Sequence, residues 1–422
     1  MKFRPLAIST VAVAALSLTA LAACGSSDQK DTAASGPTSI DVWLMKGSVS
    51  DDFLKRFTDD FAASHPDIKA NVQIQEWNGI GPKIIGALAS KDAPDVIEVG
   101  NTQVAQYSAS GGVKDLTDKK SDLKGDDWIE GLAGPGNYEG KQFGIPYYAA
   151  NRVVLYRKDL FTAAGISTPP KTREEWLADT AKVNTGGNQG IYLPGQNFYV
   201  LSGFIWDEGG DLAVKDGDTW KGALETPEAL KGMDFYKQIQ ALGKGPKDSD
   251  EAKPTQTDVF AQGKVAQMIA VPGAAELIAQ ANPALKDKIG FFPIPGKTAD
   301  KPGAVFTGGS DLIIPEASAN QDAAYTFIKE LAGEKWQVDL AKSMKYVPNR
   351  TSLASSVGAD EGVAAMAAGA ANGKATPNSP NWAAVEAKNP IKEYQTKVLT
   401  GGDPSAAAKA ADEIITQALN TK

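Results

Sequence analysis

The sequence predicts an α/β protein whose sheets are covered by helices. Short apolar runs rich in β-branched residues, such as Val96–Val99, are typical of buried strands. Between them lie longer segments in which apolar residues recur every three or four positions, as in amphipathic helices. Strands and helices that alternate through short loops favour a parallel sheet with helices on its faces. The length of 422 residues is too great for one core and suits two domains behind a leader.

The first part of the chain after the leader shows this alternation clearly. Ser50 can cap a helix in which Phe53, Phe57 and Phe61 recur every fourth residue and form a buried stripe. The run Val96–Val99 ends in small polar residues, at the edge where open α/β sheets bind ligands. The other expected elements are strands at Ile40–Leu44 and Val72–Ile74, a helix at Lys83–Ser90 opened by Pro82, and a helix at Gln103–Ser108.

The remaining elements are predicted by the same signals. Thr172 and Glu175 form a capping box for a helix that carries Trp176 and Val183. A further helix opens at Thr226-Pro227 and ends by Gly243. Strands are expected at Val153–Tyr156, Gly263–Pro272, Ala304–Phe306 and Leu312–Ile314, and Ala-rich helices after Lys374.

Composition excludes several classes of function. The formal net charge of −8 and the pI near 5.0 argue against nucleic-acid binding, which needs lysines and arginines to neutralise phosphates. The only histidine, His65, precedes a proline at a helix end, which removes His-based catalytic triads and His-rich metal sites. We predict no metal site on this ground, and we also predict no catalytic residues and no cofactor.

The N-terminus has the features of an export signal. A basic start at Met1–Arg4 precedes the apolar run Leu6–Ala20, which is too short to be a convincing membrane span. Leu21-Ala22-Ala23-Cys24 resembles the bacterial lipobox, so we expect residues 1–23 to be a lipoprotein signal peptide and Cys24 to be diacylated. Residues 24–39 are small and polar and predict a flexible tether, which holds the protein at the extracellular face of the cell membrane.

Several segments in order along the chain resemble bacterial family 1 extracellular solute-binding proteins, the sugar-capturing components of ABC importers. Gln267 departs from the resemblance, because it stands where Ala or Met is usual. The similar segments are Asp92–Asp95, Gly144–Pro146, Leu155–Phe161, Pro169–Trp176, Gly209–Asp211, Phe260–Met268 and Val347–Arg350.

The resemblance implies a two-lobed periplasmic-binding-protein clamshell of the class II type, in which each lobe is a sheet covered by helices. Residues 40–148 plus 312–355 would form the first lobe, and residues 149–311 plus 356–422 the second. The chain would cross between lobes near Tyr148–Asn151 and near Phe306–Asp311. A sugar that bridges both lobes favours the closed form, which the ABC permease recognises. A monomer is expected.

Sugar binding needs flat aromatic faces and fixed polar groups for hydroxyls. Trp77, Trp206 and Trp382 fall at strand or helix ends, and the alternative for each is packing at a rim. Gly309 follows another glycine and either lets the backbone approach ligand or forms an ordinary hinge turn. The predicted ligand-binding residues are Lys46, Trp77, Asn78, Asn101, Tyr147, Asn151, Asn197, Tyr199, Trp206, Gly309, Ser310, Asp311 and Trp382.

Part of this set is implied by the resemblance alone. Asn197 and Tyr199 match family positions that contact sugar from the second lobe, and Trp382 matches a late segment that supplies a stacking ring. Asn197 stands in place of an acidic residue, so the pattern of hydroxyls recognised should differ. Pro272-Gly273 occupies a place where an aromatic ring is expected, and that ring is missing.

The three tryptophans favour a β-linked, flat-faced sugar. The segments around Lys46, Trp77 and Asn101 resemble actinobacterial binders of chitobiose-type sugars, with cello-oligosaccharides as the alternative. Two other classes of function remain open. A secreted glycosidase would use two carboxylates, which no short motif singles out among 51 acidic residues. A surface adhesion module should lack the ordered segments of the family.

Overall fold

The larger sheet has six strands in the order β14 (Val347–Pro348), β6 (Ile145–Ala149), β13 (Gly309–Ile313), β3 (Val96–Gly100), β1 (Thr38–Met45) and β2 (Ile68–Gln75). The structure is a computed structural model, and it describes residues 36–77, 79–357 and 360–421. Strand β1 pairs in parallel with β2 and β3, whereas β13 is antiparallel to β3 and β6. The predicted parallel pairing of the first three strands is confirmed.

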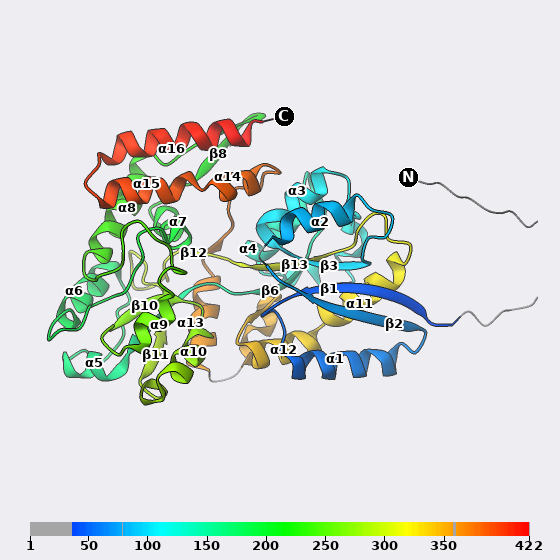
Figure 1. Cartoon of the computed structure of the whole chain (residues 1–422), viewed down its shortest axis with the longest axis horizontal. Helices are drawn as coiled ribbons and strands as arrows, with labels where there is room; N and C mark the ends of the chain where they lie inside the picture. The colour runs from blue at the N-terminus through cyan, green and yellow to red at the C-terminus, as the bar shows by residue number, and fades with distance from the viewer. Residues whose placement is uncertain (1–35, 78, 358–359, 422) are drawn as a thin grey trace, which may run out of the picture. The chain divides into compact units, whose positions relative to one another are not determined.

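One face of this sheet is covered by α1 (Asp51–Ser64), α11 (Gln321–Leu331) and α12 (Glu334–Met344). The predicted stripe of phenylalanines in α1 is buried. The ring of Phe57 lies edge-on to Phe327 and Trp336, with centroids 5.1 and 5.2 Å apart. Edge-to-face aromatic pairs stabilise a core beyond the area that they bury. Figure 1 shows α1 and α12 side by side along the sheet.

The opposite face of the sheet packs against α2 (Ile80–Leu88) and α3 (Val104–Ala109). Because side chains alternate along a strand, Val96 of β3 enters the core under α1, and Ile97 enters the core under α2. The expected start of α2 at Pro82 was wrong. The helix begins at Ile80, after Gly79 in a left-handed conformation (φ +75°) that turns the chain into it.

A second sheet is antiparallel and has three strands, in the order β10 (Gln267–Ala270), β7 (Val153–Arg157) and β11 (Ile289–Phe292). In β7, Val154 points into one apolar core and Val153 and Leu155 point into another. The first core is built with α6 (Arg173–Val183), α7 (Phe198–Asp207), α8 (Pro227–Gln240), α15 (Pro390–Leu399) and α16 (Pro404–Leu419). The second core is built with α9 (Gln256–Ala261), α10 (Ala274–Ala281) and α13 (Glu361–Ala370).

Shorter elements complete the chain. The remaining strands are β4 (Asn137–Tyr138), β5 (Lys141–Gln142), β8 (Ala213–Asp216), β9 (Thr219–Gly222), β12 (Val305–Phe306) and β15 (Gly373–Lys374). The remaining helices are α4 (Glu130–Ala133), α5 (Lys158–Ala163) and α14 (Trp382–Lys388), with 3-10 turns η1 (Asn101–Gln103), η2 (Thr117–Lys119), η3 (Gly125–Asp127), η4 (Gly134–Gly136), η5 (Pro283–Leu285) and η6 (Thr351–Val357). The capping box of Thr172 and Glu175 is present at the start of α6.

A buried polar chain explains the departure at Gln267. The indole N–H of Trp176 donates to Gln267 Oε1 at 2.8 Å. The Gln267 amide nitrogen donates to Thr180 Oγ1 at 2.9 Å and to the carbonyl oxygen of Gly190 at 3.1 Å. Buried polar groups are tolerated when each finds a partner, and here Gln267 ties α6 to β10.

The predicted lobe boundaries, 40–148 plus 312–355 and 149–311 plus 356–422, stay predictions. By contact, the chain from Pro37 onward forms one unit. Its two sheets nevertheless have separate cores on their helix-covered faces. Strands β6 and β13 pair at Ala149 and Gly309, so the two predicted crossing points lie next to each other.

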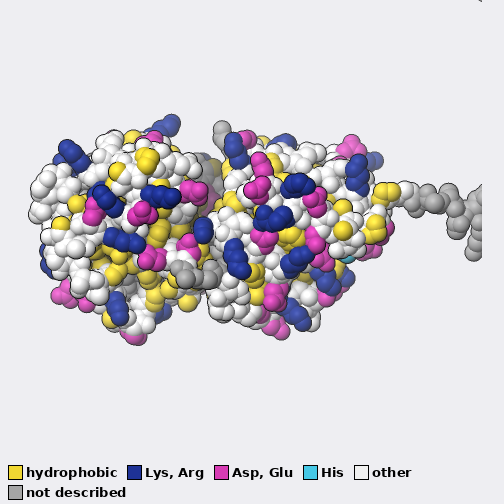
Figure 2. Space-filling model, turned by 90° about the horizontal axis from the view of Figure 1, so that it is seen from below, with side chains coloured by type: hydrophobic (Ala, Val, Ile, Leu, Met, Phe, Trp, Pro, Cys, Tyr) yellow, Lys and Arg dark blue, Asp and Glu magenta, His cyan; other side chains and the backbone are white. Residues whose placement is uncertain are grey.

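The surface carries charges of both signs. Figure 2 shows one face on which basic and acidic side chains are interspersed, without a continuous basic patch on that face. Within the described ranges, no helix is long and apolar enough to cross a bilayer. The predicted signal peptide, Cys24 and most of the tether lie outside the described residues.

Candidate functional site

The turn after β3 joins distant parts of the chain. Asn101 is buried, and its side-chain amide donates to the carbonyl oxygen of Thr307 at 2.9 Å. The hydroxyl of Thr102 donates to Glu386 Oε2 at 3.1 Å. Thr307 follows β12 and Glu386 lies in α14, so this polar turn contacts elements late in the chain. The predicted ligand-binding edge is therefore a junction between segments.

Glu386 is the centre of this junction, and sequence reasoning missed it. Besides Thr102, the Trp382 indole N–H donates to Glu386 Oε1 at 3.0 Å, and the Tyr199 hydroxyl approaches the same oxygen at 3.5 Å. Burial raises the pKa of Glu386, and these hydrogen bonds oppose the rise. The available signal was its position four residues after Trp382, which places both on one face of a helix.

Tyr199 is stacked between other side chains. Its ring lies 4.3 Å from that of Phe306 at an interplanar angle of 19°. The Arg152 guanidinium carbon lies 4.9 Å from the Tyr199 ring centroid, and Arg152 also pairs with Glu251 at 2.8 Å. The hollow beside Tyr199 and Phe306 has a volume of about 10 Å³, roughly the space that one water molecule needs. The space beside Tyr199 is therefore closed in the described conformation.

Trp77 offers an open aromatic face beside the turn after β3. Its side chain is 41% exposed, and its indole N–H donates to the Lys46 carbonyl oxygen at 3.1 Å. A Cβ atom at Gly100 would lie 3.8 Å from the Trp77 ring. The Lys46 ammonium pairs with Glu76 at 2.7 Å. Asn78, predicted beside Trp77, lies outside the described residues.

Several other predicted residues are buried and hold the local structure. Asn151 donates to the Met366 carbonyl oxygen at 3.0 Å, and Asn197 caps α7 by accepting from the Val200 N–H at 3.4 Å. The Trp206 indole donates to Asp211 at 3.1 Å. Trp382 is fully buried in the core of the second sheet, and Tyr147 in that of the first. Their roles as ligand contacts stay predictions.

The predicted residues of β13 surround a buried carboxyl group. Ser310 Oγ donates to Glu98 Oε1 at 2.6 Å, as does Ser48 Oγ at 2.6 Å, and the Met45 N–H donates to Glu98 Oε2 at 2.8 Å. Burial raises the pKa of Glu98 to about 7, although these hydrogen bonds favour the ionised form.

Asp311, the next predicted residue of β13, is fully buried, and neither of its carboxyl oxygens has a hydrogen-bond partner among the described residues. Burial therefore raises its pKa well above the ordinary value.

Gly309 is required by strand pairing. It has a φ of +154°, and a Cβ atom there would lie 2.1 Å from the Tyr148 carbonyl oxygen. Only glycine fits this approach of β13 to β6. The structure thus gives Gly309 the role of a close backbone contact at the predicted hinge, and a role in ligand binding stays a prediction.

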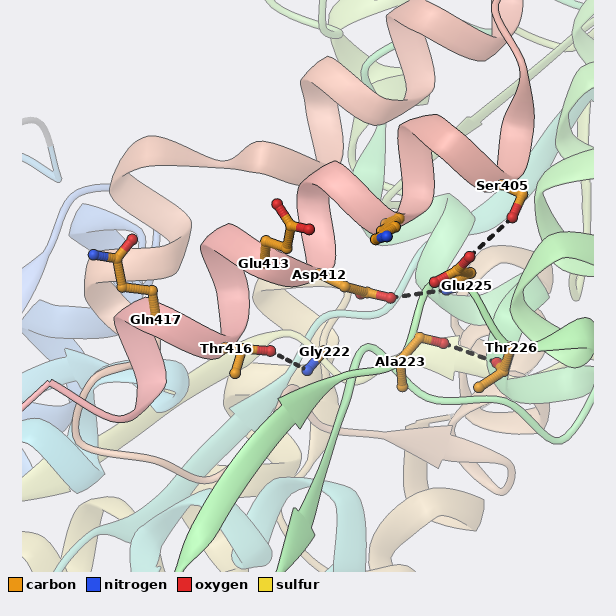
Figure 3. A pocket seen from close by; sticks show the side chains of 10 residues that line it. Gly222, Ala223, Glu225, Thr226, Ser405, Asp412, Glu413, Thr416 and Gln417 are labelled. Atoms are coloured by element: carbon orange, nitrogen blue, oxygen red, sulfur yellow. Dashed lines mark hydrogen bonds between the residues drawn. The ribbon is translucent and has the colours of Figure 1, made fainter.

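Larger hollows lie elsewhere. One of about 790 Å³ is lined by the end of β9 and one side of α16 (Figure 3). In it, Asp412 accepts from the backbone N–H groups of Leu224 and Glu225 at 2.8 and 2.9 Å. The Thr416 hydroxyl oxygen accepts from the Gly222 N–H at 2.9 Å. These bonds attach α16 to the end of the β8–β9 hairpin and to the loop that follows it. None of the residues involved is a predicted site residue. Within the described ranges, no cluster of acidic, histidine or cysteine side chains suits a metal ion.

Comparison with known proteins identifies the family. The profile of the family described as bacterial extracellular solute-binding protein matches residues 46–338. The diacetylchitobiose binding protein DasA of Streptomyces coelicolor is 39% identical over 412 residues, which cover 96% of this chain and 96% of that protein. A maltooligosaccharide ABC transporter solute-binding lipoprotein of Streptococcus pneumoniae is 26% identical, over 98% of this chain and 97% of that protein.

Solved structures confirm the fold. The sugar-binding protein MalE of Xanthomonas citri has a TM-score of 0.81 at 24% identity, over 90% of this chain and 97% of that chain. The GacH receptor of Streptomyces glaucescens has a TM-score of 0.76 at 23% identity, over 92% of this chain and all of that chain (100%). The predicted periplasmic-binding-protein fold is therefore confirmed, and the chain belongs to the bacterial extracellular solute-binding proteins.

Proposed function

We propose that this protein captures a di- or oligosaccharide and delivers it to the permease of an ABC importer. N,N′-diacetylchitobiose or a related chito-oligosaccharide is the proposed ligand. The observation that carries the proposal is the convergence of Thr102, Tyr199 and Trp382 on the Glu386 carboxyl group. The relative at 39% identity, named as a diacetylchitobiose binding protein, supports the choice of sugar.

The chemistry of the junction suits a sugar. A carboxylate accepts hydrogen bonds from hydroxyl or amide N–H groups, and Glu386 already accepts such bonds from protein donors that a ligand could replace. Trp77 supplies an exposed aromatic face, and the Tyr199 ring would become available when the elements around it separate. An acetamido group offers both an N–H donor and a methyl group that packs on a ring. A ligand bound here would contact β3, α7 and α14 together.

The proposed site combines the sequence-based set with Glu386 and Thr102. Binding in it requires an opening between α14 and the turn after β3, because their side chains touch in the described conformation. A sugar that replaces the hydrogen bond between Thr102 and Glu386 with its own hydrogen bonds to these residues would favour a closed conformation around the sugar. The ligand-binding residues proposed are Lys46, Trp77, Asn78, Asn101, Thr102, Tyr147, Asn151, Asn197, Tyr199, Trp206, Gly309, Ser310, Asp311, Trp382 and Glu386.

Membrane attachment is part of the proposal. Residues 1–23 would be removed, and lipid on Cys24 would anchor a monomer outside the cell through residues 24–39. Metabolic labelling with a radioactive fatty acid tests this arrangement. The wild-type protein should be labelled, and the Cys24→Ala protein should be unlabelled and released into the medium. Label on Cys24→Ala would refute the anchor at this residue.

Calorimetric titration tests the ligand. N,N′-diacetylchitobiose, cellobiose and maltose would each be titrated into the protein, and the bound sugar would afterwards be recovered and analysed. We expect the tightest binding for N,N′-diacetylchitobiose and recovery of uncut sugar. Tight binding of maltose alone would reject the β-linked preference, and preference for cellobiose would assign the cello-oligosaccharide alternative. Cleaved sugar would instead indicate a glycosidase.

A further inference from the structure

Glu98 links a surface turn to the strand at the predicted hinge. Its Oε2 accepts from the Met45 N–H and its Oε1 from Ser48, which lie at the two ends of the turn after β1. The same Oε1 accepts from Ser310 of β13. Glu98 is fully buried within β3. One carboxyl group thus connects three segments that are far apart in sequence.

The turn held by Glu98 supports the proposed sugar site. Lys46 lies in the turn, and its carbonyl oxygen accepts the hydrogen bond that orients the Trp77 indole. The Tyr346 hydroxyl donates to the Gly47 carbonyl oxygen at 2.6 Å, and the Tyr346 ring stacks on Tyr148 at 4.2 Å. Backbone atoms of this turn therefore determine where the exposed tryptophan face lies.

The arrangement needs a hydrogen-bond acceptor. The N–H of Met45 can only donate, whereas the hydroxyls of Ser48 and Ser310 can donate or accept. An ionised Glu98 accepts all three bonds, but a protonated one must donate from one oxygen, which reverses a serine bond. The tyrosines facing Glu98 are Tyr147 and Tyr148 of β6 and Tyr346. No basic side chain in the described ranges forms an ion pair with Glu98, and burial raises its pKa to about 7.

We propose that Glu98 is a positioning residue for sugar binding, which fixes the Met45–Ser48 turn and, through Lys46, the orientation of the Trp77 ring. Glu98 itself does not touch the ligand. This inference rests on the proposed function. If wild-type protein binds none of the sugars, the proposed function fails; if wild-type protein binds and the Glu98 variants bind equally well, only this inference fails.

The test compares Glu98→Ala with Asp412→Ala. Asp412 serves as the control, because its carboxyl group is partly buried, has a pKa raised by burial and accepts two backbone hydrogen bonds, but lies where α16 contacts the loop after β9 (Figure 3). Both variants should lower the melting temperature. At a temperature where both are folded, Glu98→Ala should weaken N,N′-diacetylchitobiose binding by about tenfold, because the turn must then be ordered on binding. Asp412→Ala should bind as the wild type does. Equal weakening in both variants would overturn the inference.

Two further variants keep the test decisive if Glu98→Ala does not fold. Ser48→Ala removes the bond from the turn to Glu98 Oε1 at a residue outside the proposed ligand-binding set, and it should weaken binding by about threefold; unchanged affinity would count against the inference. In Glu98→Gln the amide oxygen can accept from Met45, but the amide nitrogen must donate to a serine, as protonated Glu98 does, so at about pH 8 this variant should bind as weakly as the wild type does at about pH 6. Wild-type affinity should rise from about pH 6 to about pH 8 as Glu98 ionises, and Glu98→Gln should remove this change. Persistence of the pH dependence in Glu98→Gln would also overturn the inference.

Discussion

The Thr102 hydroxyl donates a hydrogen bond to the Glu386 carboxyl group across 284 positions of sequence. Thr102 follows a strand of the six-stranded sheet, and Glu386 lies in a helix packed on the core of the other sheet. In the described conformation this bond connects the two parts through one carboxyl oxygen. A ligand that enters between them must break the bond and replace it.

Replacement of Glu386 should weaken sugar binding. We expect Glu386→Ala to raise the Kd for N,N′-diacetylchitobiose at least tenfold, because hydrogen bonds to a charged acceptor contribute about 1.5–3 kcal/mol. Calorimetric titration measures this change. Glu361→Ala is the control, since Glu361 is exposed and pairs with Lys158 at 3.2 Å away from the junction. A Glu386→Ala protein with wild-type affinity would remove this residue from the site.

Trp77 and Trp382 should respond differently to truncation. Trp77→Ala should weaken binding by about 1–3 kcal/mol through lost stacking and burial, with little change in stability, because its side chain is 41% exposed. Trp382→Ala should weaken binding by a similar amount and also cost about 3–5 kcal/mol of unfolding free energy, because its ring is fully buried. Chemical denaturation and calorimetry on the same samples separate the two effects. Unaltered Kd in either variant would exclude that ring as a ligand contact.

A methyl group at Gly309 should disrupt the pairing of β13 with β6. Gly309→Ala places a Cβ atom 2.1 Å from the Tyr148 carbonyl oxygen, so the strands must move apart. We expect a loss of about 2 kcal/mol or more of unfolding free energy, measured by urea denaturation. Gly86→Ala serves as the comparison, because nothing lies within 4 Å of a Cβ atom there and the residue is inside α2. That change should stabilise the protein by up to about 1 kcal/mol. The reverse order of stabilities would contradict the geometry.

Stability should fall with rising pH through the titration of Glu98. Its pKa is about 7 in the folded protein and 4.5 in the unfolded reference, so the folded state binds the proton more tightly. The resulting stabilisation is complete below pH 4.5 and is lost as pH rises through about 7, by about 3 kcal/mol in total. The unfolding free energy of wild type minus that of Glu98→Gln, measured from pH 4 to pH 8.5, isolates this group. A difference that is flat or increases with pH would refute the raised pKa.

Local patterns predicted much of the fold. The stripe of Phe53, Phe57 and Phe61 identified α1 and its buried face, and the Thr172–Glu175 capping box located the start of α6. These signals succeed because they depend on neighbours within a few residues. The start of α2 was misplaced because Pro82 is favourable near a helix start, but the left-handed Gly79 lets the helix begin earlier.

The candidate site was less predictable, because its contacts are distant in sequence. Asn101 was predicted as a ligand contact, which stays a prediction, but its hydrogen bond to the Thr307 carbonyl oxygen, 206 positions away, had no sequence signal. Ser310 was likewise predicted as a ligand contact, and no sequence signal indicated that it donates to Glu98, which was predicted only as part of a strand. Glu386 lies in an alanine-rich segment with no motif of its own. A polar residue in such a pattern is ambiguous until the partner that contacts it is known.

The amide of Gln267 has a practical consequence for engineering. The family resemblance implies Ala or Met at this position, and a stabilisation strategy that follows it would replace Gln267. That exchange would leave the Trp176 indole N–H and the Gly190 carbonyl oxygen without the hydrogen bonds that Gln267 provides, in an apolar interior. Consensus redesign of this chain must therefore change Trp176, Thr180 and Gln267 as a group or leave all of them alone.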